Sequence, residues 1–363
     1  MKRLLFTVTN DLRYDQRMSR ICGSLASNGY DVVLIGRKKR DSPALEESPY
    51  KQKRLGCWFS KGPLFYAEYN IRLFFYLLFQ KADLICAIDM DTLLPVYSVS
   101  RIRRIRRVYD AHEFFSQMEE VISRPRIYRI WHGLEKWLIP RFPQGYTVCQ
   151  SIAEAFEKEF GVCYSVIRNL PRQNRIQTDT KREPFLLYQG AVNKGRGLEQ
   201  LLEAMEQIEI PLVIAGDGNA MKDIRHWITQ KNLSGKVTLT GMLDPEALRS
   251  YTDRALIGIN PFQRHGLNQY FSLANKFFDY IQAGLPQVTM NYPEYARING
   301  QFEVAVLIND LSPESIVSAV NNLYHDPVLY SRLRSQCQLA ATQLIWEKEE
   351  AKLIGFYETL FRR

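Results

Sequence analysis

The chain has 363 residues, 46% of them hydrophobic, which provides core for two domains rather than one. Its longest apolar stretch, Ile71 to Phe79, contains an arginine and is too short to span a bilayer, and the charged N-terminus has no signal-peptide pattern. The six cysteines lack paired metal-ligand spacing, so we expect reduced thiols in a cytoplasmic protein rather than a disulfide framework.

Positive charge is concentrated in the N-terminal part of the chain. Residues 1–168 contain 27 Lys/Arg and 18 Asp/Glu, a net of +9, whereas residues 169–363 contain 21 of each. Aromatic residues cluster between Trp58 and Tyr76. A basic surface with aromatic side chains favours an anionic membrane face or a lipid-pyrophosphate acceptor, and a solvated face over core aromatics is the alternative. No nucleic-acid-binding motif is present, and we expect no nucleic-acid partner. Five arginines belong to this excess: Arg101, Arg103, Arg104, Arg106 and Arg107.

The first 168 residues alternate between predicted strands and helices. The helix over residues 15–28 has apolar side chains at the spacing of one helix face. Asp89 and Asp91 have the spacing of an Asp-x-Asp metal motif, but they precede a helix start, where aspartates act as caps, so we expect no metal site. Strands are predicted at residues 4–8, 31–36, 82–88, 107–111 and 146–149.

A second alternating series follows a crossover at Arg168–Arg172 and a polar run to Glu183, which we predict to be an interdomain linker. Alternation of strands and helices implies parallel sheets covered on both faces, and ligands of such sheets bind beyond the carboxyl ends of the strands. Strands are predicted at residues 185–188, 211–215, 236–240, 255–260, 287–289 and 304–308.

A basic glycine-rich loop lies between the strand 185–188 and the next helix. It runs from Gly190 to Gly197 and includes Lys194 and Arg196. A strand, a glycine loop and a helix N-terminus together form a cradle for an anion, although turns also need glycine for steric reasons alone. Gly216 and Gly218 predict a second tight strand-to-helix turn, functional or purely structural.

The segment from Asn275 to Gly284 predicts a short helix ended by the glycine, with Pro286 two residues beyond. Asn275 and Asp279 are four residues apart and share a face, while Lys276 lies at the helix start. An amide, a carboxylate and an ammonium at one helix N-terminus suit a ligand that carries hydroxyls and phosphate. An amphipathic helix with a solvated face is the alternative.

With these motifs in this order, the chain resembles the retaining glycosyltransferases of family 4, the group 1 glycosyl transferases, and especially the bacterial branch that builds capsules, exopolysaccharides and O-antigens. The resemblance implies an α/β protein with the GT-B fold, in which two Rossmann-like domains face a central cleft. It also implies an acceptor-binding domain at 1–168, a nucleotide-sugar-binding domain at 169–341 and a final helix at 342–363 that returns to the first domain. The motifs are Asn10–Arg17, Tyr109–Glu113, Val166–Pro171, Tyr188–Gly197, Ile214–Gly218 and Asn275–Pro286.

The resemblance assigns roles to single residues. Asp279 matches the second glutamate of the family's Glu-x7-Glu motif, which binds the donor ribose, whereas Phe271 stands where the first glutamate is expected. Ala191 replaces an arginine of the glycine loop, and Lys194 compensates. Candidates for the donor sugar's hydroxyls are then His265, Asn268 and Tyr270. The expected donor-binding residues are Gly190, Lys194, Arg196, Gly216, Asn275, Lys276 and Asp279. The expected catalytic residues are His112, Arg196 and Lys276, and the expected acceptor-side residues are Asp11, Gln16, Arg17 and Glu113.

The predicted function is transfer of a sugar, with retention, from a nucleotide diphosphate sugar to a hydroxyl of a lipid-linked saccharide at the inner face of the cell membrane. No cofactor or metal is expected, because Arg196 and Lys276 supply charge for the leaving diphosphate. A nucleotide-sugar epimerase with the same fold and a non-enzymatic membrane scaffold are the alternatives. A nicotinamide oxidoreductase is disfavoured, since the loop after the first strand, Thr9–Leu12, contains no glycine.

Overall fold

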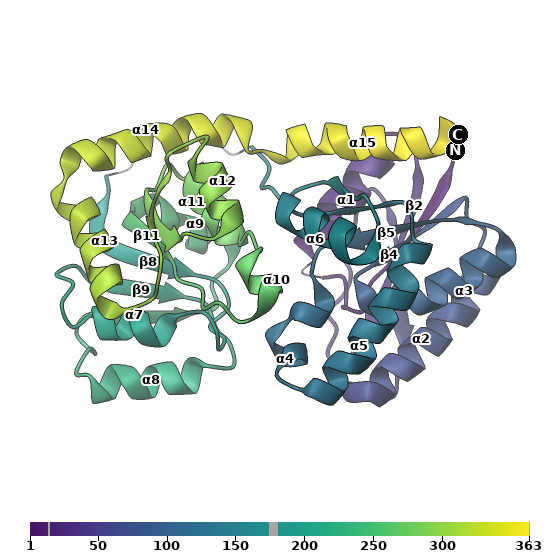
Figure 1. The fold of residues 1–363 in the computed structure, drawn as a ribbon, viewed down its shortest axis with the longest axis horizontal. Helices are drawn as coiled ribbons and strands as arrows, with labels where there is room; N and C mark the ends of the chain where they lie inside the picture. The colour runs from purple at the N-terminus through teal and green to yellow at the C-terminus, as the bar shows by residue number, and fades with distance from the viewer. Residues whose placement is uncertain (14, 174–180, 363) are drawn as a thin grey trace. The chain divides into compact units, whose positions relative to one another are not determined.

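The computed structural model describes residues 1–13, 15–173 and 181–362 of the chain. The chain divides into two compact units, the first comprising Met1–Asn169 together with the segment from Glu349 onward, and the second comprising Leu170–Lys348. Each unit is a parallel sheet with helices packed on it (Figure 1). Most of the predicted linker, residues 174–180, lies outside the described residues.

In the described part of unit 1, a seven-stranded parallel sheet has the order β3-β2-β1-β4-β5-β6-β7. The sequence predicted the five strands that lie between the two edges and missed both edge strands. β3 is a run of mostly polar, exposed residues, and β7 is only two residues long, so neither has an apolar pattern. The strands are β1 (Arg3–Thr7), β2 (Asp31–Lys38), β3 (Lys51–Gly56), β4 (Leu84–Ile88), β5 (Arg106–Ala111), β6 (Gly145–Thr147) and β7 (Ser165–Val166).

Helices of unit 1 connect these strands. The helix predicted over residues 15–28 is confirmed as α1, and the Asp15 carboxylate caps it by accepting from the Met18 N–H. The helices are α1 (Gln16–Ser27), α2 (Gly62–Phe79), α3 (Leu93–Arg103), α4 (Glu119–Ile122), α5 (Pro125–Leu138) and α6 (Gln150–Phe160), with short 3-10 turns η1 (Met90–Thr92), η2 (Phe115–Gln117) and η3 (Ile139–Arg141).

The last helix, α15 (Trp346–Arg362), begins four residues later than predicted, because α14 continues to Gln343. Its Tyr357 is fully buried, with ring centroids 6.1 Å from Phe6 and 6.3 Å from Tyr146. The Glu349 carboxylate accepts from the Arg168 backbone N–H at 3.0 Å. Residues far apart in sequence therefore share one core within unit 1.

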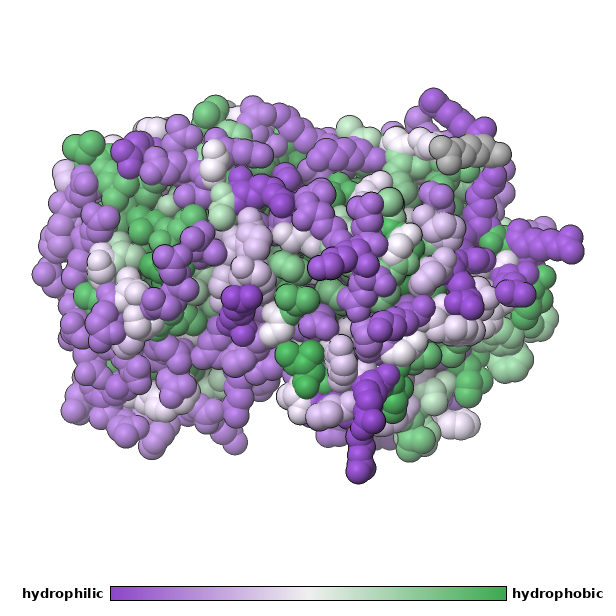
Figure 2. Space-filling view, viewed as in Figure 1, coloured by the Kyte–Doolittle hydropathy of each residue, from purple (hydrophilic) through white to green (hydrophobic). Residues whose placement is uncertain are grey.

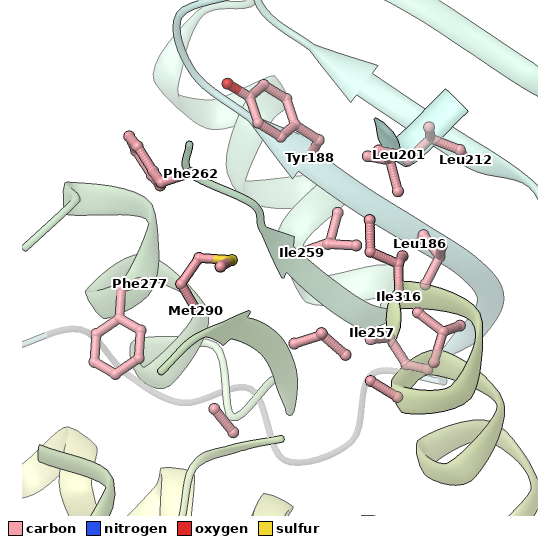
Figure 3. Close-up of a cluster of buried hydrophobic side chains, with 14 of the residues drawn as sticks. Leu186, Tyr188, Leu201, Leu212, Ile257, Ile259, Phe262, Phe277, Met290 and Ile316 are labelled. Carbon is pink, nitrogen blue, oxygen red and sulfur yellow. The ribbon is translucent and has the colours of Figure 1, made fainter. Parts of the chain in front are cut away.

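The described residues of unit 2 form a six-stranded parallel sheet with the order β10-β9-β8-β11-β12-β13. Its core includes Leu186, Ile257 and Ile259 from the central strands, together with Phe277 and Ile316 from helices (Figure 3). The strands are β8 (Glu183–Gln189), β9 (Leu212–Ala215), β10 (Val237–Gly241), β11 (Ala255–Asn260), β12 (Gln287–Met290) and β13 (Ala305–Ile308). The helices are α7 (Leu198–Ala204), α8 (Met221–Gln230), α9 (Pro245–Arg254), α10 (Gly266–Tyr270), α11 (Asn275–Gln282), α12 (Pro293–Asn299), α13 (Pro313–His325) and α14 (Pro327–Gln343).

In both sheets the strand order reverses beside the first strand of the unit, at β1/β4 in unit 1 and at β8/β11 in unit 2. Open parallel sheets bind ligands at such a switch point, beyond the carboxyl ends of the strands. The topology therefore directs attention to the loops after β1 and β4 and to the loops after β8 and β11. In the described part of the chain, no helix combines the length and apolar character needed to cross a membrane.

Candidate functional site

Two glycine turns interlock at the switch point of unit 2. Gly190 follows β8 with φ +112°, and Gly216 follows β9 with φ +153°. A Cβ on Gly216 would lie 1.8 Å from the Gly190 carbonyl oxygen, so no larger residue fits there. Asn193 and Asn219 hold the two loops together, since Asn193 Oδ1 accepts from the Asn219 N–H at 3.0 Å and Asn219 Oδ1 accepts from the Lys194 N–H at 3.2 Å. The predicted tight turn at Gly216 thus packs directly against the glycine loop.

Lys276 lies against this loop from the first turn of α11. Its side chain is buried, and its Nζ is 3.5 Å from the centroid of the Tyr188 ring and 5.5 Å from that of Phe262. Figure 3 shows these two rings at one end of the core. A Cβ on Gly190 would be 3.6 Å from the Lys276 Cε, an ordinary van der Waals contact, so the Lys276 side chain passes directly beside this turn. Burial, followed by the charge of Arg196, lowers the pKa of Lys276 well below its ordinary value.

Arg196 shares an aromatic neighbour with Lys276, because its guanidinium carbon lies 4.6 Å from the centroid of the Phe262 ring. The two cations therefore lie at one edge of the sheet, Lys276 against the rings of Tyr188 and Phe262 and Arg196 against the ring of Phe262. Lys194 and Asn275, which the sequence also places here, are exposed. A buried lysine beside a second cation that repels it provides a favourable position for a multiply charged anion.

Asp279 lies one turn further along α11. Its Oδ2 accepts a hydrogen bond of 3.0 Å from Nε2 of Gln189, the last residue of β8. The charge of Asp279 opposes the depression of the Lys276 pKa, which places the carboxylate near the Lys276 ammonium. The sequence analysis did not predict a role for Gln189. Its position as the polar residue directly after the apolar run 185–188 is a signal that could have indicated one.

The segment proposed to replace the first glutamate of the Glu-x7-Glu motif forms the short helix α10. His265 Nε2 lies 2.9 Å from the Oε1 of Gln263, and the Arg264 guanidinium stacks 4.0 Å from the centroid of the Tyr270 ring. His265 is exposed, whereas Asn268 and Tyr270 are partly buried. All three candidates belong to one short segment after β11, at the same edge of the sheet as the glycine loop.

In unit 1, His112 follows β5 and contacts a residue that follows β4. Its Nε2 lies 3.0 Å from Oδ2 of Asp89, and 31% of its side chain is exposed. Burial of the ring and the nearby charge of Arg17 lower the pKa of His112 to about 4, so the imidazole is neutral at pH 7. Burial, together with Glu113 and Asp91, raises the pKa of Asp89 well above its ordinary value. Asp89 also has φ 55° and ψ 172°, a conformation that costs a non-glycine residue about 1–3 kcal/mol.

The expectation that Asp89 and Asp91 act as helix caps is wrong. Neither the 3-10 turn η1 nor α3 has a side-chain cap hydrogen bond; Asp89 faces His112, and Asp91 Oδ2 accepts from the Thr9 hydroxyl at 2.6 Å. Both aspartates lie at the β1/β4 switch point, each with one carboxylate oxygen in contact with a neighbouring side chain. Within the described ranges, no group of three or more His, Cys, Asp or Glu side chains has an arrangement that could hold a metal ion.

Arg17, predicted on the acceptor side, is buried inside unit 1. Its guanidinium binds Asp110 through two contacts of 2.8 and 3.2 Å, and it donates to the Ile167 carbonyl at 3.3 Å. These bonds tie α1 to β5 and to the segment after β7, so the geometry gives Arg17 a structural task and corrects the prediction. Gln16 is exposed, and Asp11 and Glu113 are partly buried in loops after β1 and β5.

Both units match models of known protein families. A family model described as glycosyl transferases group 1 matches residues 171–342, and one described as glycosyltransferase family 4 matches residues 16–172. The chain is 22% identical over 183 residues to an alpha-D-kanosaminyltransferase of Streptomyces kanamyceticus and 24% identical over 153 residues to the O-antigen chain mannosyltransferase C of Escherichia coli. These alignments cover 49% and 38% of the chain and 46% and 40% of the two relatives, so each spans less than half of either protein.

Solved structures match over the whole length. A sucrose-phosphate synthase from Thermosynechococcus elongatus has a TM-score of 0.80 at 17% identity, with all of both chains covered. HepE from Anabaena, solved with UDP, has a TM-score of 0.73 at 14% identity, with 99% of this chain and 100% of HepE covered. Two parallel-sheet Rossmann-like units with these neighbours define an α/β protein of the GT-B glycosyltransferase fold. The chain belongs to the group 1 glycosyltransferases of family 4.

Proposed function

We propose that the protein transfers a glycosyl unit from a nucleoside diphosphate sugar to a hydroxyl of a saccharide acceptor, with retention of anomeric configuration. The observation that carries this proposal is the arrangement of Arg196, Lys276 and Asp279 around the glycine loop of unit 2. The two cations suit a diphosphate, and the carboxylate suits a vicinal diol such as that of ribose. The HepE structure with UDP supports a nucleotide of this class.

In the proposed reaction, the bond between the anomeric carbon and the β-phosphate oxygen breaks while the acceptor hydroxyl oxygen bonds to that carbon on the same face. The hydroxyl proton passes to an oxygen of the departing phosphate. Negative charge grows on the diphosphate in the transition state, and Arg196 and Lys276 stabilise it most at that point. The neutral imidazole of His112 contacts the transferred sugar, and Asp11, Gln16 and Glu113 contact the acceptor.

We propose that no divalent ion is required, because these two cations and the N-terminus of α11 already neutralise the leaving group. Transfer should then survive EDTA at full rate. Loss of activity on chelation that manganese restores would contradict this part of the proposal and would direct attention to Asp89 and Asp91.

The proposed acceptor is a lipid-linked saccharide of a bacterial surface polysaccharide. Two similar proteins have names of this kind, the O-antigen chain mannosyltransferase C and WaaG, which is described as a glycosyltransferase involved in lipopolysaccharide biosynthesis. The net charge of +9 on residues 1–168 supports an acceptor held at an anionic membrane.

The surface of α2 supports a membrane partner more strongly than the arginine cluster does. Hydrophobic side chains gather over α2 and α3, at the lower right of Figure 2. Trp58, at 83% exposed, stands on a loop whose backbone N–H groups donate to the Glu68 carboxylate at 2.9 Å. The large exposed hydrophobic residues of α2 are Leu64, Ile71, Phe75 and Phe79, which follow one helix face.

The experiment that tests the function combines binding with product analysis. A thermal-shift screen of nucleoside diphosphates should identify one base that stabilises the protein, because a ligand of the native state raises stability by RT ln(1 + [L]/Kd). Transfer from the matching nucleotide sugars to saccharide acceptors is then measured by mass spectrometry. Formation of an epimer of the donor without transfer, or the absence of any nucleotide ligand, would contradict the proposal.

A further inference from the structure

A buried polar chain links α9, the end of β8 and α11. The Thr252 hydroxyl lies 2.8 Å from the Gln189 Oε1 and 2.9 Å from the Leu248 carbonyl oxygen, which share its single proton. The Gln189 Nε2 donates to the Asp279 Oδ2 at 3.0 Å. Thr252 and Gln189 are only 4% and 3% exposed. Phe185 and Leu187, on the same side of β8 as Gln189, pack in an apolar cluster, so the amide is a polar group at the border of a core. Such a group costs stability unless its hydrogen bonds are satisfied.

The orientation of the Gln189 amide follows from its partners. An ionised carboxylate only accepts hydrogen bonds, so the amide nitrogen must face Asp279 and the amide oxygen must face Thr252. The main chain is held as well, since the Gln189 N–H donates to the Tyr280 hydroxyl at 3.3 Å and that hydroxyl donates to the Leu187 carbonyl at 2.8 Å. β8 is thus bonded to two successive residues of α11.

This arrangement restrains the one carboxylate that faces the proposed nucleotide site from α11. A donor held on Oδ2 resists rotation of the Asp279 carboxylate about its Cβ–Cγ bond. Because Thr252 fixes the donor and satisfied polar networks in a low-dielectric surrounding are rigid, the carboxylate plane is set before any ligand arrives. Preorganisation of this kind lowers the cost of binding.

We propose that Gln189 is a positioning residue that aims Asp279 at the ribose diol of a nucleoside diphosphate, and that the site thereby selects ribose over 2′-deoxyribose. The inference rests on the proposed function, since it concerns the nucleotide of the same site. Gln189 itself does not touch the ligand; it acts through the Asp279 carboxylate.

The test measures the affinity of the folded protein for UDP and GDP and for their 2′-deoxy forms by titration calorimetry. The wild type should bind the ribose form about tenfold more tightly than the 2′-deoxy form of the same nucleotide, because one charge-assisted hydrogen bond is lost. Gln189→Leu and Asp279→Asn should both reduce this ratio to within about twofold of unity. Asp279→Asn removes the charge, whereas Gln189→Leu leaves the charge and removes its restraint.

Gln282→Leu is the matched control. Gln282 is a buried amide of the same helix, and its Nε2 donates to the Ala341 and Leu344 carbonyls at 3.0 and 3.3 Å. This variant should keep the ribose preference of the wild type even if its melting temperature falls. Equal loss of preference in Gln282→Leu would mean general loosening of α11 and would overturn the proposal.

A folded Gln189→Leu protein with the wild-type ratio would also overturn it. If Gln189→Leu does not fold, Thr252→Val replaces it: this variant removes the hydroxyl that holds the amide and should lower the ratio about threefold or more. An unchanged ratio in Thr252→Val would then decide against the proposal. A wild type that binds no nucleoside diphosphate of any base in the thermal-shift screen contradicts the proposed function instead, so the two failures are distinguishable.

Discussion

Lys276 is a cationic side chain in surroundings that disfavour its charge when no ligand is bound. Its ammonium is buried, with the Arg196 charge nearby, and its contacts are the faces of Tyr188 and Phe262. The lowered pKa of Lys276 means that the folded protein binds fewer protons than the unfolded chain at pH values between that pKa and 10.5. Within this window, the contribution of Lys276 to the free energy of unfolding rises with pH.

A bound diphosphate should reverse the pKa shift, because two phosphate charges favour the protonated lysine. We predict that nucleoside diphosphate binding is accompanied by proton uptake and weakens as pH rises through this window. Calorimetry from pH 6 to 10 in HEPES and in Tris, whose ionisation enthalpies differ, measures the uptake. Lys276→Met should abolish the uptake and weaken binding by roughly tenfold or more. Identical binding enthalpies in the two buffers at every pH would contradict the prediction.

The Asp279 carboxylate makes a second prediction at this scale. Asp279→Ala should raise the dissociation constant of the nucleotide by roughly an order of magnitude, since hydrogen bonds to charged groups are worth about 1.5–3 kcal/mol. Fluorescence or calorimetric titration measures the change. Asn275→Ala, on the exposed start of the same helix, is the comparison variant and should have a smaller effect. Wild-type affinity in folded Asp279→Ala would remove Asp279 from the nucleotide site.

Sequence patterns could indicate the residues of the glycine loop and of α11 because each pattern is local: a glycine turn, a helix start and an i, i+4 pair. They could not indicate the partners. The contact of Asp89 with His112 and the bond of Gln189 with Asp279 join residues that are 23 and 90 positions apart, through side chains whose direction depends on the folded sheet. Arg17 was misplaced for the same reason, since its partner Asp110 is 93 positions away.

At the scale of elements, α5, α6 and η2 meet at a buried carboxyl group. Glu135 of α5 is fully buried, and its Oε1 accepts from the Ser116 N–H at 2.9 Å. Its Oε2 lies 3.7 Å from His132 Nδ1, and the other nitrogen of that ring lies 3.5 Å from Glu159 Oε1 on α6. Burial raises the pKa of Glu135 to about 7, with a smaller contribution from Glu159. Ser116 belongs to the turn that follows His112, so this carboxyl helps to hold the loop of the candidate site.

We predict that Glu135→Gln stabilises the protein above pH 7. The folded-state pKa of Glu135 is raised above its ordinary value of 4.5, so its favourable contribution is complete below pH 4.5 and is lost as pH rises through about 7. Glutamine keeps an acceptor for Ser116 and has no charge to desolvate. The difference in unfolding free energy between variant and wild type should therefore grow from pH 5 to pH 8, by on the order of 2–3 kcal/mol.

Urea unfolding at several pH values measures this difference. Glu159→Gln is the control, because Glu159 keeps 30% of its side chain exposed and should show a much smaller dependence. Parallel curves of unfolding free energy against pH for Glu135→Gln and the wild type would contradict the prediction.

Elements with a strong apolar period were predictable, and elements defined by their neighbours were not. The strand at 255–260 was predicted with the bounds of β11, since it is continuous and buried. β3 exists only because Lys51–Gly56 pairs with β2, and the break between α14 and α15 depends on the burial of Leu344, Ile345 and Trp346. Neither feature is a local property of the sequence.

At the scale of the whole molecule, the alternating pattern of strands and helices predicted two parallel-sheet units, and the structure and its neighbours confirm the GT-B fold. The proposed role of the five arginines at a membrane needs revision. Arg103 donates to the Leu77 and Gln80 carbonyls at the end of α2, and Arg107 donates to the Arg141 carbonyl at 2.7 Å. These two guanidinium groups hold elements of unit 1 together, while Arg101, Arg104 and Arg106 are exposed.

We predict that unit 1 binds anionic vesicles through α2 and the exposed arginines. Replacing Ile71, Phe75 and Phe79 with glutamine should reduce sedimentation with phosphatidylglycerol-containing vesicles by tenfold or more, because full burial of such side chains is worth about 1.5–3 kcal/mol each. Arg104→Gln with Arg106→Gln should weaken binding by roughly 1 kcal/mol per arginine and reduce its dependence on salt.

Val328 and Leu339 provide the control, since they are exposed apolar residues of α14 in unit 2. Their replacement by glutamine should leave vesicle binding unchanged. Vesicle binding of the folded α2 variant at the wild-type level, or equal binding to purely zwitterionic vesicles, would contradict the prediction.

The division of the chain has a consequence for the order in which the protein is completed during synthesis. Unit 1 takes its second segment from Glu349 onward, so the ribosome finishes all of unit 2 before it supplies Tyr357, which packs near Phe6 and Tyr146. Until then Phe6 and Tyr146, which are fully buried in the complete fold, lack one of their packing partners. We expect a fragment of residues 1–169 to remain loosely packed, and addition of a peptide spanning residues 346–362 to restore cooperative unfolding. A fragment that unfolds cooperatively without the peptide would show that unit 1 folds before its last helix is made.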